Sequence, residues 1–174
     1  YTAAGVFGVA NQNVEDARQL LAILQKESWI ETLAFMGRPL NDMDTVQARD
    51  ASRPGSQRVY LNRISSEGFR LLGIPIVRGR AFTQVEAENK APVVVVSELS
   101  AKQLWPGEDP LGKSLRLEPD QLDQARMPPF REAIVIGVSG DVVAKAKDGA
   151  PRACVHFPDI LRTGTLVAVR GKGT

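Results

Sequence analysis

The sequence predicts an α+β fold, in which a mixed sheet is built from two strand–helix–strand units with short helices on one face, arranged as one domain or as two small lobes. The first observation is a repeated order of strand, helix and strand, at residues 59–64, 65–72 and 74–78 and again at residues 93–96, 97–105 and 114–117. The second is a series of short apolar runs typical of strands, at residues 133–138, 153–157 and 165–170.

Both helices of these units have clear ends. Ser65 is placed to cap the first helix, and Gly73 is placed to end it. Ser97 is placed to cap the second helix. Apolar residues recur on one side of that helix, at Leu99, Leu104 and Trp105. Polar and apolar residues alternate over 114–118, which predicts a half-buried strand directly after the second unit's turn.

The N-terminal part, residues 1–57, is expected to hold one helix, one strand and a polar loop, and residues 58–174 hold the two units and the last three strands. Asn13 can cap the helix, because Glu15 and Asp16 follow it and apolar residues then recur at helical spacing. We expect that helix at 14–27, a strand at 29–36, and loops at 37–57 (with one short strand at 45–48) and 118–131.

The composition argues against several classes of function. A formal net charge of +2 over 174 residues is too small to predict nucleic-acid binding. With Cys154 as the single cysteine and His156 as the single histidine, the sequence predicts neither an internal disulfide nor a structural zinc site. We expect no cofactor. No apolar run reaches the roughly 18–20 residues of a membrane span. The chain begins without Met and stops just after a strand, so we expect a segment cut from a longer protein.

One stretch matches a nucleotide-binding motif. Residues 107–114 fit G-x-x-x-x-G-K-[ST], the loop whose backbone N–H groups cradle phosphates in nucleotide hydrolases. Such a loop needs a buried strand before it and a helix after it. Here the sequence predicts a helix before it and a strand after it, and Pro110 removes one N–H from within it. We therefore interpret these residues as a turn and keep nucleotide hydrolysis as an alternative.

Three blocks in fixed order carry a resemblance to a known family. They are ISSEGFRLLGIPIVRGRAF at 64–82, PVVVVSELSAKQLWPGEDPLGKSLRL at 92–117 and IVIGVSGDV at 134–142. Together they resemble the extracytoplasmic (periplasmic) core domain of MacB-type, FtsX-like ABC transporter permeases, and are most similar to the duplicated orphan permeases that lack a fused ATPase. Gly68 departs from the family's Tyr, and Ser114 is the departure that completes the nucleotide-loop match.

The resemblance implies a non-catalytic domain, not an enzyme, which lies between the first two membrane helices of a permease and faces the periplasm or the cell exterior. It implies partners as well. These are a cognate ABC ATPase acting through the parent permease, an adaptor protein, lipoprotein or peptide cargo outside the membrane, and a second permease in a homodimer. A stand-alone periplasmic ligand-binding domain is the remaining alternative, and it would need a pocket with converging polar groups.

The motif residues are expected to be structural on this interpretation. They are Phe69, Gly73, Gly79, Arg80, Phe82, Glu98, Trp105, Pro106, Gly107, Asp109, Pro110, Gly112 and Lys113. We expect the aromatic residues, with Leu72 and Leu104, to anchor the core, and the glycines to occupy turns. The four charged residues are expected either to bond turn backbone, to pair with one another or to face solvent. The loops at 37–57 and 118–131 are the candidate contact surfaces, because they are long and polar.

Overall fold

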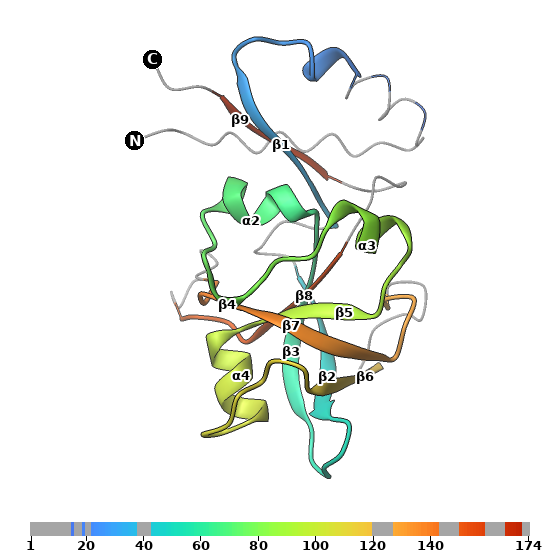
Figure 1. Cartoon of the computed structure of the whole chain (residues 1–174), viewed down its shortest axis with the longest axis vertical. Helices are drawn as coiled ribbons and strands as arrows, with labels where there is room; N and C mark the ends of the chain where they lie inside the picture. The colour runs from blue at the N-terminus through green and yellow to red at the C-terminus, as the bar shows by residue number, and fades with distance from the viewer. Residues whose placement is uncertain are drawn as a thin grey trace.

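The structure, a computed structural model, describes residues 15, 19, 22–37, 43–119, 127–142, 150–158 and 166–171. Its strands are β1 (Ile30–Met36), β2 (Asp44–Asp50), β3 (Gln57–Ile64), β4 (Ile76–Gly79), β5 (Val93–Ser97), β6 (Ser114–Pro119), β7 (Glu132–Ser139), β8 (Cys154–Pro158) and β9 (Leu166–Gly171). Its helices are α2 (Ser66–Leu72), α3 (Gln84–Glu88) and α4 (Glu98–Leu104). Figure 1 shows their arrangement.

Six strands close into a barrel, in the order β2, β6, β7, β5, β8 and β3, because β3 pairs with β2 as well as with β8. The β3–β8 and β5–β7 pairs are parallel, and the other neighbours in the barrel are antiparallel. β4 lies on the same edge of β7 as β6 does, with Gly79 opposite Gly137, whereas Ser114 of β6 lies opposite Ile134. The mixed α/β character is thus confirmed.

The arrangement as two strand–helix–strand units is wrong. β4 pairs with β7 and not with β3, the first strand of its supposed unit. β7 also separates β5 from β6, so neither unit exists as a pair of neighbouring strands. The local order of elements was visible in the sequence, but the pairing depends on residues far apart in the chain.

Side chains alternate between the two faces along the barrel strands, so that apolar side chains point into the barrel. On β2, Val46 and Ala48 are fully buried, while the intervening Gln47 is only partly buried. We call the buried residues that fill the barrel the interior cluster: Val46, Ala48, Val59, Leu61, Val94, Val96, Leu104, Trp105, Leu115, Leu117, Met127, Ala133, Val135, Val138, Ala153, Val155 and Phe157. Since this cluster draws on every barrel strand, it is what the closed sheet encloses.

The helices lie on two sides of the sheet, which corrects the prediction that they cover one face. α4 contributes Leu104 to the interior cluster and also contacts strands β2, β3, β5, β7 and β8. α2 contributes to a separate outer cluster on the other side of the sheet, defined as Ile64, Phe69, Ile74, Phe82, Val95, Val142 and Cys154. Adjacent residues of β5, Val95 and Val96, belong to the outer and the interior cluster respectively, as expected for a strand covered on both faces.

β1 and β9 form an antiparallel ribbon beside the barrel (Figure 1). Ile30 at the start of β1 lies opposite Gly171 at the end of β9. α2 lies between this ribbon and the barrel. The strand expected at 29–36 is confirmed.

Several helices and loops differ from the prediction or lie partly outside the described residues. The polar segment 37–57 contains the whole seven-residue strand β2, not one short strand in a long loop. Helix α3 was missed, although Thr83 and Glu86 form a capping box that the sequence T-x-x-E predicts. Residues 15, 19 and 22–24 of the helix expected at 14–27 are helical and residues 25–27 are not, while its other residues lie outside the described ranges. Residues 120–126 of the loop expected at 118–131 also lie outside them.

Candidate functional site

The turn that joins α4 to β6, residues 105–113, contains the nucleotide-loop match and most of the motif residues. Trp105 ends α4 and is 1% exposed. Its indole Nε1 donates a hydrogen bond of 2.7 Å to Oδ2 of Asp50, at the end of β2. The other carboxylate oxygen of Asp50 accepts hydrogen bonds from the Ser52 amide (2.8 Å) and hydroxyl (2.6 Å). These bonds, led by the Ser52 hydroxyl and including that of Trp105, hold the pKa of Asp50 below its ordinary value.

Four backbone N–H groups of this turn, those of Glu108, Leu111, Gly112 and Lys113, are used within the protein. Glu108 N donates to Trp105 O, Leu111 N to the Asp109 side chain and Lys113 N to Pro110 O. Gly112 N donates to Val135 O on β7 at 2.8 Å. A phosphate-binding loop presents such donors to its ligand. Here they hold the turn against β7 instead.

The flanking elements also differ from those of a phosphate loop. Helix α4 precedes the turn and strand β6 follows it, so no helix N-terminus points at the position of a phosphate. Lys113 Nζ forms an ion pair of 2.7 Å with Glu108, which also pairs with Arg53 of the β2–β3 hairpin. Hydrogen bonds from Arg53 and Lys113 lower the pKa of Glu108 to about 2. The lysine that would reach phosphates is therefore committed to a neighbouring carboxylate.

The four charged motif residues do not pair with one another. Asp109 pairs with Arg78 of β4 at 2.7 Å, which ties the turn to the edge of the sheet. Arg80 pairs with Glu86 of α3. Glu98 lines a small cleft of about 130 Å³ beside Trp105. The expectation that some would bond turn backbone applies to Asp109, whose carboxylate accepts from Leu111 N at 3.0 Å.

The remaining motif residues gather around α2, β4 and α3. Phe69 and Phe82 are buried in the outer cluster, with ring centroids 5.4 Å apart. Arg80 makes two hydrogen bonds to Glu86, of 2.7 and 2.8 Å, and Glu86 also accepts from the Thr83 amide at 2.8 Å. The Arg80 bonds, aided by Thr83, lower the pKa of Glu86 to about 2. The Gly-Arg-x-Phe motif thus stabilises the start of α3 through Arg80 and contributes Phe82 to the outer cluster.

Comparison with known proteins agrees with this geometry. Residues 6–172 match the family described as MacB-like periplasmic core domain. This chain belongs to that family, the periplasmic core domain of ABC transporter permeases. The family is an extracytoplasmic one, and no helix in the described ranges is long and apolar enough to cross a membrane.

Solved structures share the fold. The periplasmic region of MacB from Actinobacillus actinomycetemcomitans matches 95% of this chain and 68% of its own, with a TM-score of 0.63 and 20% identity. The extracellular domain of the ABC-type transporter YknZ from Gram-positive bacteria matches 97% of this chain and 75% of its own, with a TM-score of 0.62 and 16% identity. A permease-protein domain from Porphyromonas gingivalis matches 99% of this chain and 65% of its own, with a TM-score of 0.58 and 17% identity. Comparison with curated proteins finds no match.

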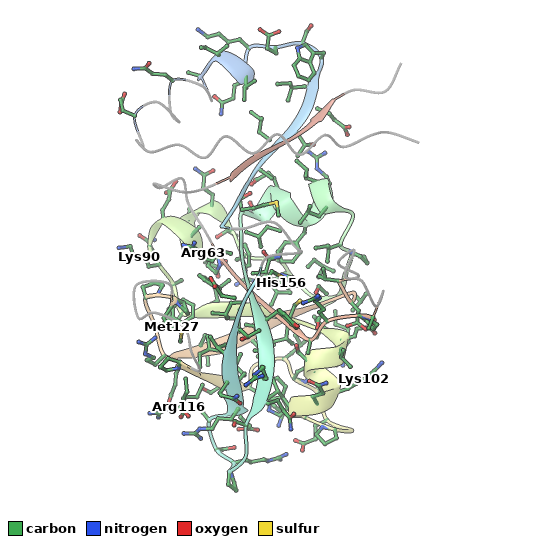
Figure 2. All side chains as sticks on the ribbon, turned by 180° about the vertical axis from the view of Figure 1, so that it is seen from behind. Arg63, Lys90, Lys102, Arg116, Met127 and His156 are labelled. Carbon is green, nitrogen blue, oxygen red and sulfur yellow. The ribbon has the colours of Figure 1, made fainter. Side chains whose placement is uncertain are left out.

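The core domain also contains a buried polar chain that sequence reasoning missed. His156 is 0% exposed and sits at the centre of the molecule, whereas Lys102 and Arg116 lie at its periphery (Figure 2). Asn62 Nδ2 lies 3.0 Å from its Nδ1, and Ser139 Oγ lies 3.3 Å from its Nε2 and 3.0 Å from Gly140 O. If Asn62 donates to Nδ1, then Nε2 carries the proton and donates to Ser139, which donates onward to Gly140. Burial lowers the pKa of His156 to about 3, so the ring is neutral.

Two polar residues hold α4 in this MacB-like domain. Ser97 Oγ accepts hydrogen bonds from Ser100 N at 3.3 Å and from Cys154 N at 3.0 Å, which joins the helix cap to β8. Asp141 Oδ1 accepts from Leu99 N at 2.7 Å. Asp141 lies in the I-V-I-G-V-S-G-D-V block, so the motif contained the signal, but its partner 42 residues away could not be seen in the sequence.

The surface hollows of the described residues do not resemble a ligand pocket. One hollow, of about 400 Å³, lies where the 105–113 turn and β6 meet the end of β2, and its lining includes Asp50, Lys113 and Glu132. Each of these side chains already has a partner, since Glu132 pairs with Arg116 and the others are bonded as described above. No cluster of potential metal ligands occurs in the described part of the chain. These features give no support to the ligand-binding alternative.

Proposed function

We propose that this chain is a non-catalytic module of an ABC transporter permease, which carries motion from a separate cytoplasmic ATPase outward and contacts a partner protein or cargo. Family membership supports the transporter setting. The β1–β9 register supports the mechanical part, because Ile30, where β1 begins, and Gly171, where β9 ends, lie opposite each other at one end of the ribbon. A ribbon whose first and last residues are paired in this way can be moved as one unit by the segments attached to it.

The proposed contact surface is the end of the barrel away from the ribbon. The β2–β3 hairpin reaches furthest from the ribbon in Figure 1. Its residues 52–56 are exposed and belong to the polar segment that we expected to contact partners. An adaptor protein, lipoprotein or peptide cargo would meet this tip first. The intact permease would be an integral membrane protein, working as a homodimer with its cognate ATPase.

Labelling in intact cells tests this proposal. A cysteine at the exposed Ser56 of the full-length parent protein is treated with a membrane-impermeant maleimide. We expect labelling from outside the cytoplasm and, with a photo-crosslinker at the same position, capture of a partner. The native Cys154 gives little background, because burial raises the pKa of its thiol to about 12. Labelling of Ser56→Cys only after cell lysis would refute an extracytoplasmic role.

A parent-gene sequence supplies the second half of the test. Apolar runs of about 20 residues on both sides of this segment would support a domain held between membrane helices. A cleavable signal peptide and an early stop codon would favour the stand-alone periplasmic alternative instead.

A further inference from the structure

Helix α2 packs on the barrel with one face and on the ribbon with the other (Figure 1). Phe69 belongs to the outer cluster of the barrel, whereas Leu71 belongs to a separate cluster with Ala34 and Met36 of β1. Two residues along an α-helix correspond to about 200° of rotation, so these side chains point to opposite sides. The helix is therefore clamped between the two parts and does not merely cover one of them.

The barrel side of α2 is tightly fitted. Phe69 packs against Phe82 and, edge-on, against His156, with ring centroids 5.4 and 5.2 Å away. A Cβ placed on Gly68 would lie 2.1 Å from Cγ1 of Ile64 on β3. The helix backbone thus packs directly against the Ile64 side chain, which leaves no room for a Cβ at residue 68.

The ribbon side combines apolar and polar contacts. Leu71 is 1% exposed and Ala34 and Met36 are 0% and 1% exposed. Arg70 Nη2 donates a hydrogen bond of 2.7 Å to Thr32 Oγ1 on β1. The ribbon therefore touches α2 through a closed apolar contact with one hydrogen bond beside it.

Few backbone contacts join the ribbon to the barrel directly, compared with the contacts that the ribbon makes with α2. In the described residues, β1 and β3 share one register pair, Met36 with Ile64, followed by a hydrogen bond of 2.8 Å from Gly37 N to Arg63 O. One pair of residues holds the ribbon to the barrel at a single point, but it resists rotation of the ribbon about that point only weakly. The orientation of the ribbon relative to the barrel then depends on the Leu71 contact.

We propose that α2 is the coupling element of the domain, which converts movement of the ribbon into movement of the barrel through Leu71 on one face and Phe69 on the other. The direction of transmission, from ribbon to barrel, rests on the proposed function. The joint itself does not, because it is a property of this chain alone.

Distances between spin labels test the joint in this 174-residue chain. One label pair joins Glu31→Cys on β1 to Lys102→Cys on α4, and a control pair joins Lys102→Cys to Gln57→Cys within the barrel. All three positions are exposed, and the buried Cys154 thiol stays unlabelled. We expect Leu71→Ala to broaden the ribbon–barrel distribution about twofold and to leave the barrel pair unchanged.

Leu104→Ala is the matched control, because it removes the same side chain from the barrel core without touching the ribbon. It should leave the ribbon–barrel distribution narrow. Thr32→Val, which deletes the Arg70 hydrogen bond, is the milder variant if Leu71→Ala does not fold, and it should broaden the same distribution. An unchanged distribution in the folded Leu71 or Thr32 variant, or equal broadening by Leu104→Ala, overturns the proposal. Neither result bears on the labelling experiment in intact cells, so the two ideas can fail separately.

Discussion

Trp105 Nε1 and Asp50 Oδ2 are joined by a buried hydrogen bond of 2.7 Å that spans 55 residues of sequence. The bond fixes the end of α4 to the end of β2, and the indole ring fills the interior cluster beside Leu104. Asp50 in turn orders the start of the β2–β3 hairpin through Ser52. One indole therefore stabilises both the core and the tip that we propose as a contact surface.

Trp105→Ala should lower the free energy of unfolding by about 3–5 kcal/mol, because it leaves a cavity in the core and removes the indole donor from Asp50 Oδ2. Urea unfolding followed by circular dichroism measures this loss. Trp105→Phe should cost less, about 1–3 kcal/mol, since it keeps an aromatic ring and loses the hydrogen bond.

Lys113→Ala is the comparison within the same turn and should leave the unfolding midpoint almost unchanged, because its ion pair with Glu108 is solvent-accessible. A Lys113 variant as unstable as Trp105→Ala would contradict the structural roles given to this turn.

The stability of the domain should fall as the pH drops below 6.5, in part because of His156. The unfolded chain takes up a proton near pH 6.5, whereas burial keeps the folded ring neutral down to a pKa of about 3. The stabilisation is thus complete above pH 6.5 and is lost progressively between these values, by an amount on the order of 5 kcal/mol.

NMR can follow this group without assignment problems, since the chain has a single histidine. Its ring signals should not titrate between pH 8 and 5. His156→Gln should flatten the pH dependence of unfolding between pH 6.5 and 5 relative to the parent chain, whatever its effect at neutral pH. A ring that titrates near 6.5 would show that the Asn62–His156–Ser139 chain is open to water.

Local signals in the sequence predicted local structure well. Ser65 and Gly73 mark the two ends of α2, and Gly73 adopts the left-handed conformation that ends helices. The apolar runs located β5, β7 and β8, and the run in β5 is unbroken because that strand is covered on both faces. β2 was predicted only as a short strand at 45–48, because Val46 and Ala48 are its only apolar inward-facing residues and Asp44 and Asp50 stand at its ends.

Closure of the barrel could not be predicted, because it is set by pairings between distant segments. β2 joins β3 on one side and β6 on the other, and the second pairing places Asp50 opposite Leu115, 65 positions later. The same limit applies to the site. Trp105 was expected in the core from its type and position, but its partner Asp50 lies in a segment that looked like a loop.

Two glycines with the same backbone conformation should respond differently to substitution. Gly73 and Gly79 have φ values of 68° and 66°. Gly73→Ala meets no atom within 4 Å, so only the left-handed conformation opposes it, at about 1–2 kcal/mol. Gly79→Ala would place Cβ 2.4 Å from the carbonyl oxygen of Ile136 on β7, which the paired backbone cannot easily relieve.

Gly79→Ala should therefore have a clearly lower melting temperature than Gly73→Ala. Gly73→Ala is the control, because only the left-handed backbone conformation destabilises it. Equal melting temperatures would mean that β4 can move away from β7, and that the Gly-Arg-x-Phe motif does not depend on their close contact.

The turn at 107–114 should not bind nucleotide, despite its match to the phosphate-loop pattern. Gly112 N–H is bonded to Val135, Lys113 is paired with Glu108, and a strand follows where a phosphate loop needs a helix. Calorimetric titration of the chain with MgATP should show no binding tighter than about 100 μM. The matched variant is Lys113→Ala, which should give the same flat titration as the parent chain. Tight binding that Lys113→Ala abolishes would require the turn to open and release its backbone donors, and it would replace the transporter-module interpretation with that of a nucleotide-binding protein.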